Sequence, residues 1–386
     1  MRTIALVTTS RADWGIYRSL LKAIAADPDL ELRLIVAGMH LSPEFGLTVG
    51  EIEAEGWQIS ERVECLLSSD SPQGGAMSLG LAVMGYAQAL SRLAPDLLVV
   101  LGDRFEMFAA AAAAAPLGLP LAHIHGGELT LGAVDDAFRH AITKLSHLHF
   151  TTTQGHARRV IQMGEEPWRV TVCGAPSLDN LAALTLLETA ELEARLGLPL
   201  KPAPLLVTFH PVTLEAGQAE HQMTELLAAL EAAGRPVIFT LPNADAGGRR
   251  LARMVREFAT RQPMTWVRDN LGSQVYFSLL RDAAAMVGNS SSGIIEAPSL
   301  GLPVVNIGSR QAGRERGANV IDVTCERGAI LAGITQACQP GWRETLAATP
   351  NPYFQGGAAD RITRRLRDVV LDQRLIQKRF HDLAWE

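Results

Sequence analysis

The chain lacks the cysteine patterns of disulfide frameworks and of structural metal sites. It has four cysteines in 386 residues, Cys65, Cys173, Cys325 and Cys338, and none of them forms a CxxC pair. Isolated cysteines of this kind are typical of reduced thiols in a cytosolic protein. We therefore expect a cytoplasmic protein without disulfides and without a cysteine-bound metal.

The chain also lacks an excess of basic residues. It has 35 Lys and Arg against 41 Asp and Glu, which gives a net charge of −6. This balance disfavours binding to nucleic acid, although local basic patches remain compatible with it. A length of 386 residues exceeds one ordinary hydrophobic core, so two domains are expected.

No apolar run in the sequence predicts a secretion signal or a membrane span. The N-terminus, MRTIALVTTSRAD, has a short apolar run and no cleavage site. The segment 105–124 is long enough to cross a membrane and carries one charge, but Pro116, Gly118 and Pro120 interrupt it. It is better explained as a buried helix, a turn and a buried strand.

The GxGxxG fingerprint of dehydrogenases is missing as well. The first expected strand leads instead into TTSRADWG. Arg11, just after this strand, is placed to meet a phosphate, unless it is an ordinary surface arginine.

What the chain does contain is an alternation of strands and helices from end to end. The expected strands are Thr3–Thr8, Leu32–Val36, Ile59–Val63, Asp96–Leu101, His149–Thr153, Val170–Cys173, Leu205–Phe209, Val237–Leu241, Ala284–Val287, Val304–Ile307 and Val320–Val323. Such alternation predicts a doubly wound α/β architecture. The Ser- and Gly-rich residues 65–80 are expected to form a loop.

A Leu- and Pro-rich stretch at about 175–203 divides this pattern into two halves. We expect an N-terminal Rossmann-like domain over 1–175 and a C-terminal one over 176–360. A final helix over 361–386 follows, which would pack back on the first domain. A repeat supports two similar halves, because LGLPLAHI at 117–124 aligns with LGLPVVNI at 300–307.

Residues 102–140 gather most of the acids and histidines of the first half. Asp103 follows a buried strand, and His123, His125 and Glu128 follow the next one. A strand–helix–strand unit returns both strand ends to the same edge of a sheet, so these side chains should lie together. Grouped carboxylates and imidazoles can shift one another's pKa and transfer protons. For any single residue, a solvated loop charge or a helix cap is the alternative.

In the second half, GNSSSG at 288–293 stands between a buried strand and a helix expected from about Ile294. Backbone N–H groups and serine hydroxyls at a helix start form an anion site, so a phosphate is the expected ligand, with simple capping as the alternative. Glu296, one turn into that helix, could accept hydrogen bonds from a ribose diol.

Three further segments follow expected strands of the second half: His210 in FHPVT, Asn243 in PNADAGG and Arg310 in GSRQAGRER. An imidazole and clustered guanidinium groups suit a diphosphate, whereas turns and solvated charges are the alternatives. The second half thus offers groups for a nucleotide diphosphate, and the first offers acids and bases. Ligands of doubly wound folds bind at the carboxyl ends of the strands, which predicts a ligand in an interdomain cleft.

These segments resemble the hydrolysing UDP-N-acetylglucosamine 2-epimerases of sialic and legionaminic acid biosynthesis. The resemblance spans nearly the whole chain, and the matching motifs occur in order: SRADWG, GDRFE, HIHGGE, DDAFRHAITKLSHLHF, FHPVT, PNADAGG, GNSSSGIIE and GSRQAGRE. It implies a GT-B-like α/β fold, a UDP-sugar substrate, no cofactor and no metal, and a homo-oligomer such as a dimer.

The resemblance also implies roles for single residues. Phosphates would be held by Ser290, Ser291 and Arg310, with His210 and Arg11 nearby, the ribose by Glu296, and Asn243 would lie beside the nucleotide. The positions that match catalytic acids are Asp103, Asp135 and Asp136, and those on the sugar side are His123, Arg139 and His140.

The implied reaction removes the proton from C2 while UDP leaves C1, and water then adds to the resulting 2-acetamidoglycal to release the free 2-epimer. Many relatives carry Glu where this chain has His125. Either Glu128 supplies the carboxylate, or His125 itself acts as acid and base. Either UDP-N-acetylglucosamine or UDP-N,N′-diacetylbacillosamine fits as substrate. The remaining alternatives are a non-hydrolysing 2-epimerase, a GT-B glycosyltransferase and a non-catalytic sensor.

Overall fold

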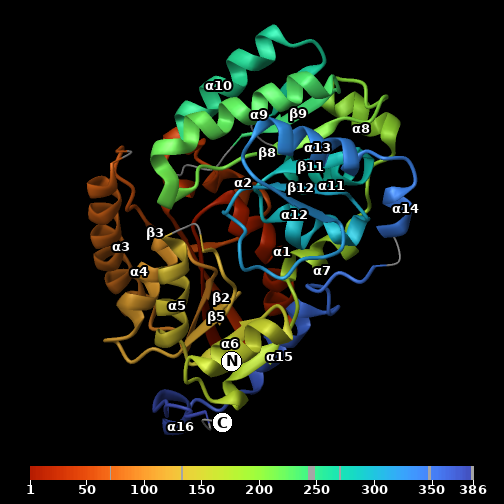
Figure 1. Ribbon diagram of the computed structural model, residues 1–386. Helices are drawn as coiled ribbons and strands as arrows, with labels where there is room; N and C mark the ends of the chain where they lie inside the picture. Colours follow the sequence, from red (N-terminus) through yellow and green to blue (C-terminus); the bar gives the residue numbers. More distant parts are fainter. Residues whose placement is uncertain (70, 132–133, 242–247, 269–270, 347–348, 384–386) are drawn as a thin grey trace. The chain divides into compact units, whose positions relative to one another are not determined.

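The computed structural model describes residues 1–69, 71–131, 134–241, 248–268, 271–346 and 349–383. The chain divides into two compact units. Figure 1 colours the chain along its sequence, from red at the N-terminus to blue at the C-terminus. Unit 1 comprises Met1–Glu128, Val134–Asn180 and Gln355–Glu386, and unit 2 comprises Leu129–Ala133 and Leu181–Phe354. These limits lie five and six residues from the expected ones (180 against 175, and 354 against 360).

Unit 1 is built on a seven-stranded parallel sheet in the order β3-β2-β1-β4-β5-β6-β7. Its strands are β1 (Arg2–Thr8), β2 (Leu30–Ala37), β3 (Ile59–Val63), β4 (Leu97–Leu101), β5 (Leu121–Ile124), β6 (Leu148–Thr151) and β7 (Val170–Val172). The helices are α1 (Arg11–Ala26), α2 (Val49–Ala54), α3 (Pro72–Leu93), α4 (Phe105–Ala114), α5 (Asp135–Leu145), α6 (Gln154–Gln162), α15 (Ala358–Asp368) and α16 (Gln373–Ile376), with α7 (Pro176–Ala183) at the limit of the unit. Short 3-10 turns are η1 (Gly38–Leu41), η2 (Pro43–Phe45) and η3 (Pro167–Arg169).

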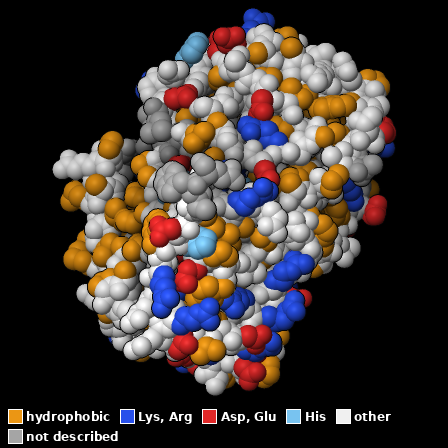
Figure 2. All heavy atoms as spheres, turned by 60° about the horizontal axis from the view of Figure 1, so that its bottom comes forward, with side chains coloured by type: hydrophobic (Ala, Val, Ile, Leu, Met, Phe, Trp, Pro, Cys, Tyr) orange, Lys and Arg blue, Asp and Glu red, His pale blue; other side chains and the backbone are white. Residues whose placement is uncertain are grey.

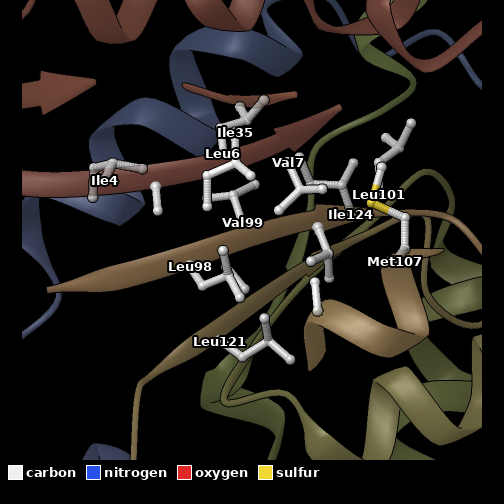
Figure 3. Packing of buried hydrophobic residues seen from close by; sticks show 14 of the residues in the cluster. Ile4, Leu6, Val7, Ile35, Leu98, Val99, Leu101, Met107, Leu121 and Ile124 are labelled. Carbon is white, nitrogen blue, oxygen red and sulfur yellow. The ribbon is translucent and has the colours of Figure 1, made fainter. Parts of the chain in front are cut away.

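The core of unit 1 lies along its central strands. Figure 3 shows Ile4, Leu6 and Val7 of β1 packed beside Leu98 and Val99 of β4. All five residues of β4 are buried, as expected for a strand covered on both faces of a parallel sheet. This packing holds the carboxyl ends of β4 and β5 in place.

Unit 2 repeats the pattern with a six-stranded parallel sheet in the order β10-β9-β8-β11-β12-β13. Its strands are β8 (Leu205–Thr208), β9 (Val237–Thr240), β10 (Thr265–Arg268), β11 (Ala285–Gly288), β12 (Val304–Ile307) and β13 (Val320–Val323). The helices are α8 (Thr189–Leu196), α9 (Ala219–Ala233), α10 (Gly248–Arg261), α11 (Gly272–Asp282), α12 (Ser292–Ile295), α13 (Arg327–Ala337) and α14 (Trp342–Leu346), with 3-10 turns η4 (Thr213–Gln218) and η5 (Ala297–Leu300).

The second sheet is buried on both of its faces. Along β8, Leu205 and Val207 belong to one apolar cluster and Leu206 to another. Because successive side chains of a strand point to opposite faces, the two clusters cover the two faces of the sheet. The expectation of two doubly wound Rossmann-like domains is therefore confirmed.

The apolar segment 105–124 is a helix, a turn and a strand, as predicted: α4, then β5. Across the part of the chain that the structure describes, no helix is both long enough and apolar enough to span a membrane. The LGLP repeat is also borne out, since β5 and β12 occupy the same place in their sheets, next to β4 and β11.

Three sequence-based predictions were wrong in detail. Residues 72–80 are not a loop but the start of α3, because Ser71 accepts a hydrogen bond from Gly74 N and Pro72 starts the helix with a suitable φ. The half-buried edge strand β10 was missed. The final helix is not continuous, because α15 ends at Asp368 and α16 is a separate turn.

Candidate active site

Asp103 lies at the carboxyl end of β4 and pairs with a buried arginine. Gly102 before it adopts a φ of +74° and donates its N–H to Ile124 O (2.9 Å), which ties the ends of β4 and β5 together. The Asp103 carboxylate accepts a hydrogen bond from Arg139 Nη2. With 21% of its side chain exposed, Asp103 is the more accessible partner of this pair.

His125 directly follows β5 and has an unusual backbone conformation. Its φ is +66°, in the left-handed region that few non-glycine residues adopt. Its N–H donates to Phe150 O (2.9 Å) and its carbonyl accepts from Arg139 Nη1 (2.8 Å), which together hold this conformation. Strained backbone of this kind is concentrated at functional sites.

The imidazole of His125 is fixed by Glu128. Nδ1 lies 2.7 Å from Glu128 Oε1, and both side chains are buried. Because a carboxylate only accepts, Nδ1 donates this hydrogen bond. Nε2 is buried and has no hydrogen-bond partner among the residues that the structure describes. This nitrogen is therefore available for proton transfer.

Glu128 is linked to two residues that sequence reasoning missed. Thr152 Oγ1 donates to Glu128 Oε1 (3.2 Å) and lies 2.7 Å from His156 Nδ1. Both follow β6 in the segment TTTQGH, and their position after a buried strand was the available signal.

Arg139 joins Asp103 to the His125–Glu128 pair. Its side chain is 2% exposed, and Nη1 lies 3.8 Å from Glu128 Oε2. Burial acts to lower the pKa of Arg139, but the carboxylates of Asp103 and Glu128 outweigh it and raise the pKa. The predicted meeting of Asp103 with the His123–Glu128 segment is thus confirmed.

His123 does not fit a residue that contacts a sugar. It is fully buried, with Nε2 2.7 Å from Gly102 O and Nδ1 3.1 Å from Thr143 Oγ1. Burial lowers the pKa of His123 to about 3, so the ring is neutral at physiological pH. Both nitrogens are occupied by the chain itself, which makes His123 a link between the end of β4 and α5.

The remaining candidates of unit 1 lie on α5 and at the start of α1. Asp135 and Asp136 form the first turn of α5, and His140 Nε2 is 3.4 Å from Asp136 Oδ2. Burial lowers the pKa of His140, while Asp136 acts to raise it. Arg11 is exposed at the start of α1, after β1. Asp135, Asp136 and His140 are half-buried and lie on the helix that also carries Arg139.

In unit 2, Asn289 organises the end of β11. This residue was not singled out from the sequence, although it lies in GNSSSG. Its Oδ1 accepts from His210 N (2.7 Å), and its Nδ2 donates to His210 O (2.8 Å). The Asn289 carbonyl accepts from Arg310 Nη1 (3.1 Å) and Gln311 Nε2 (2.8 Å). One buried residue thereby contacts both candidate residues, His210 through its side-chain amide and Arg310 through its backbone carbonyl.

Gly288 makes this arrangement possible. It has a φ of +135°, and a Cβ at this position would lie 1.9 Å from the Thr208 carbonyl oxygen. Only glycine lets β11 pass this close to β8 before the serine segment begins.

Ser290 and Ser291 follow Asn289, half-buried, and lead into α12. This helix is a single turn, not the longer helix expected from Ile294. Glu296, which is 9% exposed, is both the C-cap of α12 and the N-cap of η5. The two elements do not merge into one α-helix because Pro298 prevents it. Asn243 lies outside the described residues.

Unit 1 therefore presents a carboxylate and a carboxylate-bound imidazole for proton transfer. Unit 2 presents hydroxyl, imidazole and guanidinium groups that suit a phosphate. Each set lies at the carboxyl ends of its own sheet, where doubly wound folds bind ligands.

The chain is similar in sequence to known nucleotide-sugar epimerases. The family model described as UDP-N-acetylglucosamine 2-epimerase matches residues 22–367. A Campylobacter jejuni protein named GDP/UDP-N,N′-diacetylbacillosamine 2-epimerase (hydrolyzing) is 41% identical over 83% of this chain and 84% of its own. A Legionella pneumophila protein named UDP-N,N′-diacetylbacillosamine 2-epimerase (hydrolyzing) is 35% identical over 98% and 99% of the two chains.

Solved structures show the same fold. A Neisseria meningitidis UDP-GlcNAc 2-epimerase bound to UDP-GlcNAc has a TM-score of 0.79 at 17% identity, over 95% of this chain and 99% of that one. The predicted GT-B-like fold with two Rossmann-like domains is confirmed by this likeness. The sequence matches extend over most of the chain at well above 30% identity, and the chain therefore belongs to the UDP-N-acetylglucosamine 2-epimerase family.

Proposed function

We propose that the protein is a hydrolysing 2-epimerase that converts a UDP-linked 2-acetamido sugar and water to UDP and the free 2-epimeric sugar. The observation that carries this proposal is the group formed by Asp103, Arg139, His125 and Glu128. It supplies an accessible carboxylate and an oriented imidazole at one sheet edge. An epimerisation by elimination and addition needs two such proton-transferring groups.

In the first step Asp103 removes the proton from C2 of the sugar. The electrons of the C2–H bond form the C1–C2 double bond, and the C1–O bond breaks with its electron pair on UDP. The products are a 2-acetamidoglycal and the nucleotide. The hydrogen bond from Arg139 orients the Asp103 carboxylate for this step.

In the second step His125 provides the acid–base chemistry of hydration. Water adds its oxygen to C1, and a proton is delivered to C2 on the face opposite to the one that lost it. The Nδ1–H of His125 is held by Glu128, so Nε2 can relay the proton. Asp135 and Asp136, in the first turn of α5, are the further acids assigned to this side of the reaction.

Unit 2 supplies the nucleotide groups. We assign the diphosphate to Ser290, Ser291, Arg310 and His210, and the ribose to Glu296. Support comes from Asn289, whose hydrogen bonds hold the His210 backbone and the Arg310 side chain at the same sheet edge. Cationic and hydroxyl donors there would stabilise the charge that develops on departing UDP.

Two UDP-linked 2-acetamido sugars are the proposed substrates. The relatives at 41% and 35% identity carry names that specify N,N′-diacetylbacillosamine. A Neisseria meningitidis relative at 35% identity is named UDP-N-acetylglucosamine 2-epimerase. The two substrates differ at C4 and C6 and share the 2-acetamido group on which the proposed chemistry acts.

The test is a substrate panel in D2O. The purified protein is incubated with UDP-N-acetylglucosamine or UDP-N,N′-diacetylbacillosamine, and the products are analysed by chromatography and NMR. We expect free UDP and an equimolar free sugar of manno configuration that carries deuterium at C2. Recovery of only UDP-linked sugars would support a non-hydrolysing epimerase instead, and a product without deuterium at C2 would exclude the elimination.

A further inference from the structure

The C-terminal tail, residues 373–383, is fastened to unit 1 by buried groups that the proposed reaction does not use. Arg169, which is 1% exposed, donates from Nη1 to Leu375 O (2.8 Å) and from Nη2 to Arg374 O (2.7 Å). Further along, His381 N donates to Gly164 O (2.9 Å). Figure 2 brings this end of unit 1 forward and shows Lys and Arg side chains gathered on it.

Lys378 directs the tail onto the C-terminal end of α5. Its ammonium group donates to Lys144 O (2.7 Å) and to Ser146 O (2.6 Å). Helix α5 ends at Leu145, so these are carbonyls that the helix itself leaves unbonded. A cation at this end is also favoured by the helix dipole. Lys378 thus acts as a cap for α5 that is supplied from 234 residues further along the chain.

The Lys378 ammonium also donates to the carboxylate of Glu165. Nζ lies 2.8 Å from Glu165 Oε2, and this carboxylate is fully buried. It also accepts from Lys144 Nζ (2.6 Å) and lies 2.9 Å from His149 Nε2. Burial acts to raise the pKa of Glu165, but these hydrogen bonds outweigh it and lower the pKa to about 2. The carboxylate therefore stays ionised and holds both lysines.

Helix α5 carries the residues on which the proposed chemistry depends. Its first turn contains Asp135 and Asp136, and Arg139 binds both Asp103 and the His125 carbonyl. A rigid helix transmits a displacement of one end to the other, about 16 Å away for 11 residues. Movement along the helix axis would shift Arg139 relative to Asp103 and His125.

We propose that Lys378 is a positioning residue for catalysis: by capping α5 from the tail, it fixes the helix along its axis and so sets Arg139 against Asp103 and His125. This inference rests on the proposed function. Lys378 touches neither Asp103 nor His125 and acts only through α5. Its effect should therefore appear in kcat and leave the binding of UDP to unit 2 unchanged.

The experiment compares Lys378→Met, which keeps the apolar stem and removes the ammonium, with Lys378→Arg, which keeps the charge. The exposed Arg379→Met is the matched control. We expect Lys378→Met to lower kcat by at least ~10-fold, since displacements of about 1 Å can cost on the order of 100-fold. Lys378→Arg should recover most of this loss, Arg379→Met should behave as wild type, and UDP affinity from calorimetry should agree within about twofold in all three.

Hydrogen exchange of the α5 amides gives a second readout that does not need turnover. Lys378→Met should exchange faster over 136–145 than wild type and Arg379→Met. A kcat within about twofold of wild type, or an equal loss in Arg379→Met, overturns the inference. If Lys378→Met does not fold, Lys378→Gln decides, because its shorter, uncharged side chain also removes the ammonium from the two carbonyls: unchanged kcat overturns the inference, and lowered kcat with faster α5 exchange supports it.

The two proposals fail in different ways. A wild-type protein that releases no UDP from either sugar defeats the proposed function. In that case unchanged α5 exchange in Lys378→Met defeats the positioning role as well, independently of any activity.

Discussion

His125 stands in a left-handed backbone conformation that costs a non-glycine residue about 1–3 kcal/mol. The surrounding hydrogen bonds to Phe150 and Arg139 maintain it. The conformation turns the imidazole towards Glu128, three residues ahead. Asparagine or glycine would tolerate this backbone better, so the presence of histidine indicates a requirement for its ring.

His125→Ala should therefore lower turnover by at least ~100-fold, which is typical of the loss of a positioned acid–base group. Steady-state kinetics of UDP release measure this effect. The same substitution at His221, which is exposed on α9, is the control and should leave turnover unchanged. A His125→Ala protein with nearly wild-type turnover would show that Glu128 serves without the imidazole.

At the scale of secondary-structure elements, His123 links β4, β5 and α5. It lies on β5, donates from Nε2 to the carbonyl of Gly102 after β4, and accepts at Nδ1 from Thr143 Oγ1 on α5. The ring must be neutral to do so, because burial holds its pKa at about 3. In the unfolded chain a histidine has a pKa of about 6.5.

This difference predicts how stability depends on pH. Between about pH 6.5 and 3 the unfolded chain binds a proton that folded His123 does not, so stability is fully present above pH 6.5 and falls as the pH is lowered. Between pH 7 and pH 5, protonation of this one group should lower the free energy of unfolding by about 2 kcal/mol. Urea unfolding at pH 7 and pH 5 measures this effect: the decrease in the free energy of unfolding should be about 2 kcal/mol smaller in His123→Gln than in wild type.

The control for this measurement is His221→Gln, at an exposed position. It should lose as much stability between pH 7 and 5 as wild type does. Equal losses in His123→Gln and wild type would mean that His123 is protonated or exposed in the folded protein.

The sequence predicted those elements that local pattern determines. Strand β4 is apolar throughout, and Pro116 and Gly118 mark the turn after α4, so both were found. Strand β10 was missed because Thr265–Arg268 is half-buried along its length and has no clear alternation. Helix α3 begins at Pro72, inside the expected loop 65–80, because its Gly-rich start is stabilised by capping.

The sequence predicted the residues of the candidate site and the meeting of Asp103 with the His123–Glu128 segment, but not the detailed contacts within the site. The position of Asp103 after a buried strand located it correctly. The positive φ of His125, the double hydrogen bond of Asn289 and the enclosure of His123 arise from tertiary packing. No pattern in the surrounding residues encodes them.

At the scale of the whole molecule, the two units repeat one plan with different chemistry. Both sheets begin with the order 3-2-1-4-5-6 when each unit's strands are numbered from its own start, which follows from the two strand orders. In unit 1 the edge that follows β4 and β5 holds Asp103 and His125, whereas in unit 2 the edge that follows β8 and β11 holds His210 and Asn289. The proposed division is proton transfer in unit 1 and nucleotide binding in unit 2.

This division predicts that substitutions in the two units have separable effects. Asp103→Asn should lower turnover by at least ~100-fold, because a general base is lost, and leave UDP affinity unchanged. Glu296→Ala should weaken UDP binding by about 10-fold or more, because hydrogen bonds of the ribose to a charged group are lost. Stopped assays of UDP release and calorimetric titration with UDP measure the two quantities.

Matched controls are the exposed Asp29→Asn and Glu326→Ala, which should change neither quantity. The informative outcome is the cross-comparison, since a merely destabilised protein would lose both functions together. If Asp103→Asn weakened UDP binding as much as it lowered turnover, Asp103 would act on the nucleotide and not as the base. If Glu296→Ala kept its UDP affinity, the ribose would be held elsewhere, and the buried position of Glu296 between α12 and η5 would serve only the local fold.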